Sequence, residues 1–442
     1  MPTSHFPLSP EPDLQQSLIG HSLTSPSIPV PSLILDRSKA RRNCDAMLDV
    51  CRKLNVGFRA HVKSHKTLQL AKMQVGGAAE EKTGGWPANF IVSTVLEAEQ
   101  LIGYVRECHS IGRPASILYG VPPAPSVLPR LFSLANNVAP CTINILLDNL
   151  SSFNHVLTAL SSLPDTVSPR PTIGIFIKID TGYHRAGIHP SSAAFEPLID
   201  QILGAEVGKK GVVLQGLYSH YGHSYAGSSV EEAADGLIAE LEGLLSAGSV
   251  VQSRIMALYP DYKRLILTVG ATPTATVAQT LLFAESADNT TIPALSTSSI
   301  SLSLLAEITS VYPPDTPGRF NTKPERLISA GSMALGREPC KAYPGWGIAL
   351  PALGNESNQI YDFGAEEGKR EGWIVGKVSQ EHGVLVYEGG GGYGGLEVGE
   401  RVLIWPNHAC VAGAGFGWYV VVDEDVEGGG KVVDVWARWR GW

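Results

Sequence analysis

Two histidines and two lysines lie within six consecutive positions, 61–66, of this 442-residue sequence. They lie at the end of a predicted β-strand at 58–62 and in the residues that follow it. Catalytic side chains of α/β barrels come from the carboxyl ends of the strands. A lysine that is desolvated there and flanked by other cations has a lowered pKa, so its free amine can form a Schiff base. A solvated basic loop explains the composition of this segment equally well.

A second strand end carries an arginine between two glycines. Gly182 and Gly187, in the segment 177–188, permit a tight turn that can present Arg185 as a planar, bidentate donor to a carboxylate. Arg185 can also pair with Asp180, a structural role that needs no ligand.

Aromatic rings and small residues end two later strands. The segment 216–225 brings together histidines and tyrosines on which a flat heterocycle can stack. The segment 268–274, Thr-Val-Gly-Ala-Thr-Pro-Thr, predicts a strand-to-helix turn whose backbone N–H groups and hydroxyls suit a phosphate. Such a turn also caps a helix when no ligand is present.

His408 and Cys410 stand two positions apart, just after a predicted strand at 401–405. Side chains at this spacing on an extended chain point to the same side, and both are ligands for a soft divalent ion such as zinc. Two protein ligands leave coordination positions for water or substrate, as in catalytic metal sites. A His-x-Cys pair also arises often by chance.

The first two thirds of the chain alternate short β-branched runs with longer amphipathic stretches. This alternation predicts βαβ units and a parallel sheet. The predicted strands are 58–62, 90–95, 116–120, 144–148, 172–180, 212–220 and 265–270, and predicted helices include 96–107, 127–136 and 230–245. A (β/α)8 barrel is the natural closure for this count, with 281–285 as a poor candidate for the eighth strand.

After about residue 295 the chain changes to β-rich segments separated by glycine and proline. The predicted strands there are 304–312, 373–378, 384–387, 401–405 and 418–422. We predict a barrel at 32–295 and a C-terminal β domain at 296–442, after a flexible lead-in at 1–31. The glycine-rich run 389–395 is interpreted as a hairpin loop, because no helix is predicted after it, as a phosphate-binding loop requires.

Composition excludes several classes of protein. Apolar residues make up 44% and charged residues 17% of the chain, as in globular proteins, and a net charge of -8 gives no basic surface for nucleic acid. No apolar run reaches the roughly 18 residues of a membrane-spanning helix, and residues 1–31 do not resemble a secretory signal. Six scattered cysteines argue against a disulfide framework, so we expect a cytoplasmic protein.

Taken together, these segments resemble the D-serine dehydratase and D-threonine aldolase family, relatives of alanine racemase with a barrel followed by a β domain. The resemblance spans roughly residues 29–420 and is strongest for fungal-type D-serine dehydratases. Its most specific pieces are His-Val-Lys-Ser-His-Lys at 61–66 and Pro-Asn-His-Ala-Cys at 406–410, with support from 33–36, 270–274, 329–335 and 381–383.

The resemblance implies two cofactors. Lys63, rather than Lys66, matches the Schiff-base lysine that holds pyridoxal 5'-phosphate, and His408 and Cys410 match a zinc pair. The other residues matched to the cofactor or its surroundings are Arg185, near the substrate carboxylate, His220, which stacks on the ring, Tyr225, Gly270, Ala271 and Thr272.

The implied reaction is a β-elimination from a D-amino acid. Lys63 removes the α-proton and zinc makes the hydroxyl a better leaving group, so that D-serine gives pyruvate and ammonia. The alternatives are D-threonine aldolase-type cleavage of D-β-hydroxy amino acids and a catalytically impaired cofactor-binding homologue. An amino-acid racemase fits less well, because the His-x-Cys pair has no role there. Kinship at the level of the fold suggests a homodimer.

One departure from the family lies after the turn at 270–274. The family follows this turn with a strand that reads approximately Glu-Leu-x-Pro/Ala-Gly-Asn-Tyr, which closes the barrel and donates backbone N–H groups to the phosphate. The segment 276–303 offers serine, threonine and alanine instead. We therefore expect either a divergent closure of the barrel or weakened cofactor binding.

Overall fold

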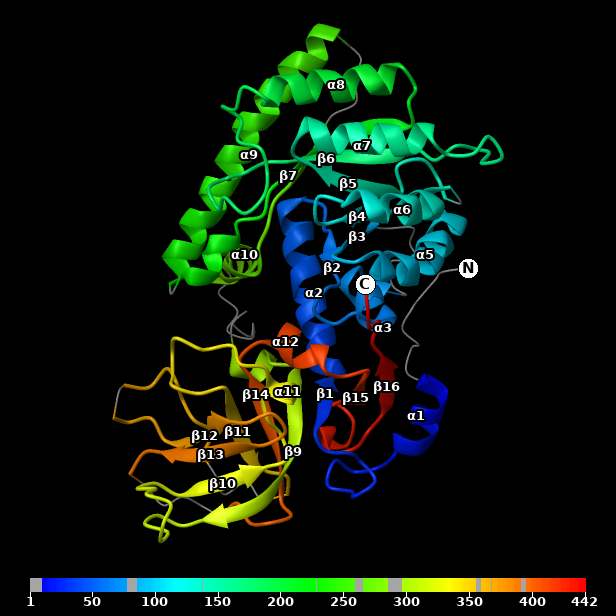
Figure 1. Cartoon of the computed structure of the whole chain (residues 1–442). Helices are drawn as coiled ribbons and strands as arrows, with labels where there is room; N and C mark the ends of the chain where they lie inside the picture. Colours follow the sequence, from blue (N-terminus) through cyan, green and yellow to red (C-terminus); the bar gives the residue numbers. More distant parts are fainter. Residues whose placement is uncertain are drawn as a thin grey trace.

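The computed structural model describes residues 10–77, 86–136, 138–227, 229–258, 265–284, 296–354, 359–366, 368–390 and 395–442. These residues form two β-sheets, one of seven strands and one of nine. The seven-stranded sheet with its helices, residues 60–284, is called the half-barrel, and the nine-stranded sheet is called the β domain; they are the upper and lower parts of Figure 1. The predicted combination of a parallel α/β unit and a β domain is confirmed.

Each strand of the half-barrel pairs in parallel with the next strand along the chain. The central strands are buried along their whole length, which is why isoleucine and leucine dominate their sequences. All seven predicted strands are present, with shifted ends: β2 (Ala60–His61), β3 (Ala88–Val92), β4 (Ala115–Tyr119), β5 (Ile143–Leu147), β6 (Ile173–Lys178), β7 (Val212–Tyr218) and β8 (Ile266–Thr268).

Amphipathic helices pack on the half-barrel sheet. In one of them, α5, Leu101, Val105 and Cys108 recur three or four residues apart and are buried in the half-barrel core. The three predicted helices are confirmed as α5 (Val95–Ser110), α6 (Leu128–Ala135) and α9 (Val230–Leu258). The other helices are α3 (Leu68–Gln74), α7 (Leu150–Ser161), α8 (Phe195–Val207) and α10 (Thr272–Ala284).

The half-barrel sheet is open, because the described residues contain no eighth strand between β8 and β2. The candidate strand at 281–285 is wrong over 281–284, which end helix α10; residues 285–295 lie outside the described part of the chain. Helix α2 (Arg37–Leu54) contacts α3, which follows β2, and α10, which follows β8. Within the described residues, helices therefore bridge the two edges of the sheet where a strand was expected.

The long strand β9 closes the β domain on itself. Its first half pairs antiparallel with β1 (Ser32–Asp36) and β14, and its second half pairs with β10, so that β10-β13-β12-β11-β14-β9 form a ring. The strands are β9 (Leu302–Tyr312), β10 (Glu325–Ile328), β11 (Gly347–Ala352), β12 (Gly372–Val378), β13 (Gly383–Glu388), β14 (Arg401–Pro406), β15 (Trp418–Val422) and β16 (Asp434–Ala437). The five predicted strands are among them, whereas 391–394 of the predicted hairpin loop lie outside the described residues.

The structure corrects the predicted start of each domain. Strand β1 (Ser32–Asp36) pairs with β9 and β15, so it belongs to the β domain and not to the barrel. Residues 10–31, predicted as part of a flexible lead-in, contain helix α1 (Glu11–Leu18) and bury Leu18, Leu23 and Ile28 against the β domain. These three apolar side chains fix the segment, although serine and proline dominate its composition.

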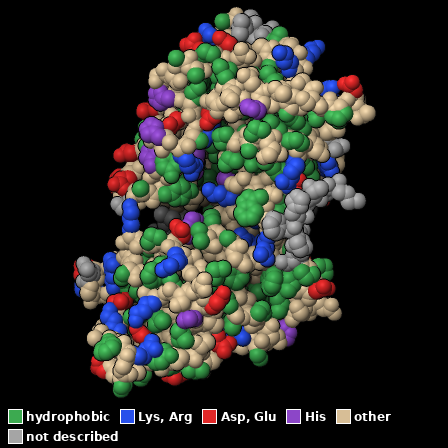
Figure 2. Space-filling model, in the orientation of Figure 1, with side chains coloured by type: hydrophobic (Ala, Val, Ile, Leu, Met, Phe, Trp, Pro, Cys, Tyr) green, Lys and Arg blue, Asp and Glu red, His purple; other side chains and the backbone are tan. Residues whose placement is uncertain are grey.

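The two domains meet along a waist that is hollowed on the face shown in Figure 2, with Lys, Arg and His side chains around the hollow. After β16 the chain crosses this waist, and Trp439 is buried in the half-barrel core. The Trp439 N–H donates to the carbonyl of Lys66 at 2.8 Å, in the loop after β2. None of the described helices has both the length and the apolar character needed to span a membrane.

Candidate active site

The loop after β2 carries the cluster of lysines and histidines. The Val62 N–H donates to the Ile91 carbonyl at 3.1 Å, and the Lys66 N–H donates to the Val62 carbonyl at 2.9 Å. Thr67 then caps α3 by accepting a hydrogen bond from the Leu70 N–H. The loop, residues 61–67, therefore stands at the carboxyl end of a half-barrel strand, where an α/β barrel places its catalytic groups. We call it the lysine loop.

Lys63 and Lys66 differ in their partners. The Lys66 amine lies 2.6 Å from Glu97 Oε1, and Glu97 is fully buried, so Lys66 is held in an ion pair. Lys63 is exposed, and in the described part of the chain its amine forms neither a hydrogen bond nor an ion pair. The desolvation expected for this lysine is therefore not observed. Its unpaired amine, unlike that of Lys66, is open to an aldehyde, and the role of Lys63 as Schiff-base lysine stays a prediction.

Cations surround the imidazole rings near Lys63. Burial, and then the charge of Lys63, lower the pKa of His61 to about 3. Burial also lowers the pKa of His65 to about 4. The pKa of His220 is lowered first by burial and also by Arg185 and Lys63. The rings are therefore neutral at pH 7, and the cations beside them attract an anionic ligand.

The loop after β6 presents Arg185 to solvent. Gly182 and Gly187 have φ angles of +111° and +123°, which glycine adopts without strain. Asp180 accepts hydrogen bonds from the backbone N–H groups of Gly182 and His184, both at 3.0 Å, and lies 2.9 Å from His184 Nδ1. No carboxylate pairs with Arg185 among the described residues. The alternative ion pair between Arg185 and Asp180 is therefore not formed.

His220, Tyr225 and the turn before α10 form one cluster. His220 Nδ1–H donates to the Gly270 carbonyl at 2.9 Å. Tyr225 Oη accepts a hydrogen bond from the Thr272 N–H at 3.3 Å and donates to Thr272 Oγ1 at 3.1 Å, while Ala271 is buried. Gly270 has a φ of +140°, and no heavy atom lies within 4 Å of the position that a Cβ would take. The turn thus has free space beside the first N–H groups of α10.

The metal pair lies at the start of a short helix. His408 directly precedes α12 (Ala409–Ala414), which follows β14, so Cys410 is helical and not on an extended chain as its spacing suggested. Cys410 Sγ lies 2.8 Å from Ser64 Oγ in the lysine loop. A single chain therefore brings the metal-pair segment, residues 407–414, against the lysine loop.

Asn407 anchors the metal-pair segment. Its side-chain N–H groups donate to the carbonyls of Glu338 at 2.9 Å and Gly345 at 2.8 Å, and the Tyr343 hydroxyl donates to its Oδ1. His408 Nδ1 lies 3.7 Å from Glu338 Oε2. Across the described residues, no three His, Cys, Asp or Glu side chains group so as to hold a metal ion. The site therefore stays a predicted two-ligand site, with positions for water or substrate.

Comparisons with known proteins reveal the family of the chain. A family model described as "Putative serine dehydratase domain" matches residues 301–422. A D-serine dehydratase of Schizosaccharomyces pombe is 31% identical over 97% of this chain and 95% of the yeast protein. The chain belongs to the D-serine dehydratase family. Its predicted resemblance to the fungal proteins is thereby confirmed, and so is its nature as an enzyme of a lyase family.

Solved structures share the fold of this D-serine dehydratase family member. An alanine racemase-like protein of Idiomarina loihiensis has a TM-score of 0.69 and 24% identity, covering 94% of this chain and 98% of its own. A D-threo-3-hydroxyaspartate dehydratase of Delftia sp. has a TM-score of 0.68 and 22% identity, covering 95% of this chain and 100% of its own. These likenesses confirm the alanine racemase-like architecture.

The site residues fit pyridoxal phosphate, the cofactor of the D-serine dehydratase family. The unpaired amine of Lys63 suits the aldehyde, and the open space beside Gly270, at the start of α10, suits the phosphate. His220 is fixed by its hydrogen bond to Gly270, so its ring has one orientation. An imidazole and a thiol from the metal-pair segment are the donors that zinc prefers.

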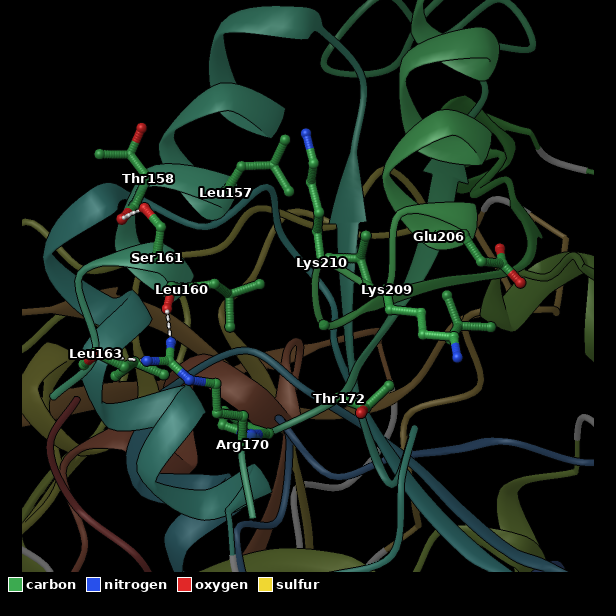
Figure 3. A pocket seen from close by; sticks show the side chains of 14 residues that line it. Leu157, Thr158, Leu160, Ser161, Leu163, Arg170, Thr172, Glu206, Lys209 and Lys210 are labelled. Atoms are coloured by element: carbon green, nitrogen blue, oxygen red, sulfur yellow. Dashed lines mark hydrogen bonds between the residues drawn. The ribbon is translucent and has the colours of Figure 1, made fainter. Parts of the chain in front are cut away.

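A cavity of about 730 Å³ lies at the opposite end of the half-barrel, where β6 and β7 begin and α7 and α8 end (Figure 3). Arg170 lines it and donates to the carbonyls of Leu160 at 3.2 Å and Leu163 at 3.3 Å, the dashed lines in Figure 3. Basic side chains at the ends of helices stabilise unpaired carbonyl groups. The cavity therefore has a structural explanation and lies away from the candidate site of this family member.

Two buried charged residues beside the site were not predicted from the sequence. Glu240 of α9 is fully buried; burial raises its pKa, against the lowering effects of the Gly270 N–H and of Lys178. A signal was present, because position 240 continues the buried face of α9 formed by 244, 247, 251 and 255. The other residue, Arg438, lies against the lysine loop, and no motif surrounds it in the sequence.

Proposed function

We propose that this chain is a D-serine dehydratase that depends on pyridoxal phosphate and zinc and converts D-serine to pyruvate and ammonia. The observation that carries the proposal is the 2.8 Å contact between Ser64 Oγ and Cys410 Sγ. It brings the exposed amine of Lys63 and a metal-binding thiol to the same region of one chain. Both serve a β-elimination, because the amine can remove the α-proton and a metal held by the thiol can stabilise the leaving hydroxyl.

The proposed binding residues follow from the site. Bound there, pyridoxal phosphate supplies an electron sink for the charge that develops at the α-carbon, and zinc polarises the substrate hydroxyl. A D-threo-3-hydroxyaspartate dehydratase variant with one cysteine replaced by alanine is described in a metal-free form, which supports a metal site in proteins of this fold. The residues that would hold the cofactor are Lys63, His220, Tyr225, Gly270, Ala271 and Thr272, and those that would hold zinc are His408 and Cys410.

The chain's own groups handle the proton and the substrate charge. Lys63 Nζ takes the α-proton, because Lys66 is already paired with the buried carboxylate of Glu97. His61, whose pKa is lowered to about 3, stays neutral beside the amine. Arg185 binds the substrate carboxylate with two parallel N–H groups, since no side-chain carboxylate occupies its guanidinium within the described chain.

The proposal includes a reducing compartment and a homodimer. All six cysteines are free, which supports a cytoplasmic location. The homodimer rests on kinship at the level of the fold. Sedimentation of the purified chain at two concentrations measures the oligomeric state, and a monomer at micromolar concentration removes this part of the proposal.

The experiment is turnover of D-serine by the purified chain with pyridoxal phosphate and zinc added. We expect pyruvate and ammonia in equal amounts from D-serine and neither from L-serine. Chelation, or Cys410→Ala, lowers the rate about 100-fold or more, because the leaving hydroxyl loses its metal. Cys44→Ala, on α2, is the matched control and keeps the rate. Glycine and an aldehyde from D-threonine, without pyruvate from D-serine, support the aldolase alternative, whereas bound cofactor without turnover supports an impaired homologue.

A further inference from the structure

Arg438 lies where the chain passes from the β domain to the half-barrel. It follows β16, its backbone N–H donates to the Gly417 carbonyl at 2.8 Å, and its side chain is 3% exposed. The next residue, Trp439, is buried in the half-barrel core. The guanidinium is therefore held inside the contact between the two domains.

The guanidinium of Arg438 binds the backbone of the lysine loop. Nε donates to the His65 carbonyl at 3.1 Å, and Nη2 donates to the Ser64 carbonyl at 3.0 Å. The Trp439 N–H donates to the Lys66 carbonyl at 2.8 Å. Three consecutive carbonyl groups of the loop, directly after Lys63, are thus fixed by two neighbouring residues of the crossing segment.

The same guanidinium also contacts the chain just after the metal-pair segment. Nη1 donates to the Phe416 carbonyl at 3.2 Å. A Cβ on Gly413 would lie 2.9 Å from Nη2, so this position, one turn after Cys410, has no room for a side chain. Within the described chain no carboxylate pairs with Arg438, and its charge is met by carbonyl groups and by the Tyr419 ring at 5.2 Å.

We infer that Arg438 is a positioning residue, which fixes the lysine loop relative to the metal-pair segment so that Lys63 and zinc act on the same substrate. The inference rests on the proposed function. The planar guanidinium can serve three carbonyl groups from two segments at once, which the single ammonium of lysine cannot do with the same geometry. Displacement of a reacting group by about 1 Å lowers a rate about 100-fold, so a loss of this link affects kcat more than KM.

The test replaces Arg438 with methionine, which keeps an unbranched apolar stem and removes the guanidinium donors. Arg401→Met is the matched control, because Arg401 is also buried and donates to two carbonyls, those of Leu23 and Ile28, both at 3.0 Å. Those carbonyls belong to the packed segment before β1, away from the site. Gly413→Ala is a second variant. Its added methyl group, on α12, would contact the guanidinium and displace it without removing it.

Three readouts are compared: the affinity for pyridoxal phosphate by absorbance titration, the affinity of the cofactor-free chain for zinc, and kcat and KM for D-serine. In Arg438→Met we expect both affinities to fall about 10-fold and kcat about 100-fold, with KM changed less than about 3-fold. Added guanidinium ion restores part of kcat in this variant alone. Arg401→Met lowers the thermal midpoint and leaves the three readouts unchanged, and Gly413→Ala shifts them in the same direction as Arg438→Met but less.

Equal losses in Arg438→Met and Arg401→Met, or unchanged affinities in Arg438→Met, overturn the inference. If Arg438→Met does not fold, Gly413→Ala decides, and unchanged kcat and affinities there overturn it. If the unaltered chain binds cofactor and zinc but does not act on D-serine, the proposed function fails alone. The two affinities then still test Arg438.

Discussion

The two ends of the half-barrel both gather basic side chains, but the positive charge has different partners at each end. Where the strands begin, Arg170 donates to carbonyls at the end of α7 and pairs with Asp165 at 3.0 Å. Where the strands end, Lys63 and Arg185 have no carboxylate partner in the described chain. Arg170 thus stabilises the fold at one end of the half-barrel, whereas Lys63 and Arg185 remain available to a ligand at the other end.

The direction of the chain explains this difference. In a βα unit the helix begins at the carboxyl end of its strand, so N–H groups gather at that end and unpaired carbonyls gather at the other. A large cavity marks the other end, where Arg170 is paired with Asp165. Unpaired cations at the end where the helices begin are therefore a better guide to the candidate site than the volume of a cavity.

The largest effect is expected at the lysine loop. Lys63→Ala lowers D-serine turnover at least about 1,000-fold, because it removes the amine that takes the α-proton. Lys66→Met instead leaves the buried Glu97 carboxylate without its cation, which lowers the free energy of unfolding by about 3 kcal/mol. Turnover and thermal unfolding of both variants measure this contrast. Full activity in Lys63→Ala would contradict the comparison of the two lysines.

Arg185 gives the next largest effect. Arg185→Lys keeps the charge but loses the two parallel donors, so KM for D-serine rises about 10-fold. Arg170→Lys, at the other end of the half-barrel, is the control and leaves KM unchanged. Steady-state kinetics on the two variants decide the matter, and an equal KM in Arg185→Lys would remove this residue from substrate binding.

The buried imidazoles of the lysine loop predict a dependence of stability on pH. In the folded chain the pKa of His65 is about 4, whereas an unfolded histidine titrates near 6.5. Between these values the unfolded chain binds a proton that the folded chain does not. Stability is therefore complete above pH 6.5 and falls on acidification, by at most about 1.4 kcal/mol per pH unit for this group.

Thermal midpoints between pH 7.5 and 4.5 measure this slope. His65→Gln flattens it, because the variant carries no titrating ring at the buried position. His189→Gln, at an exposed position after β6, serves as the control and keeps the slope of the unaltered chain. Identical slopes in all three proteins would mean that His65 does not contribute to the acid sensitivity.

The smallest effect is expected at the cavity. Lys209→Gln with Lys210→Gln removes two exposed charges beside it and changes kcat and KM for D-serine less than about 2-fold. The kinetics of the double variant provide the check. A loss above 10-fold would show that the end of the half-barrel with the cavity contributes to the reaction.

The strands of the half-barrel could be predicted because each carries its own local signal. Ile143–Leu147 is buried at all five positions, and four of its five residues are isoleucine or leucine. The place of Ser32–Asp36 could not be predicted, since its partners are 302–305 and 420–422, hundreds of residues away. The open edge of the sheet has the same cause, because the contact of α2 with α10 is tertiary and has no local pattern.

The candidate site was predictable to a similar extent. The predicted strands indicated that Lys63 and Arg185 lie at the same end of the sheet, because the carboxyl end of each strand follows from chain direction alone. The sequence could not show which lysine is paired, since the partner of Lys66 is Glu97, in helix α5 after strand β3. Nor could it show Arg438, whose acceptors are carbonyl groups that every residue carries.

Borohydride reduction of the chain in the presence of pyridoxal phosphate, followed by peptide mapping, tests the central claim most directly. We expect the cofactor to be attached to Lys63 and Lys66 to remain unmodified. Attachment to Lys66, to another lysine such as Lys178, or to no lysine at all would contradict it.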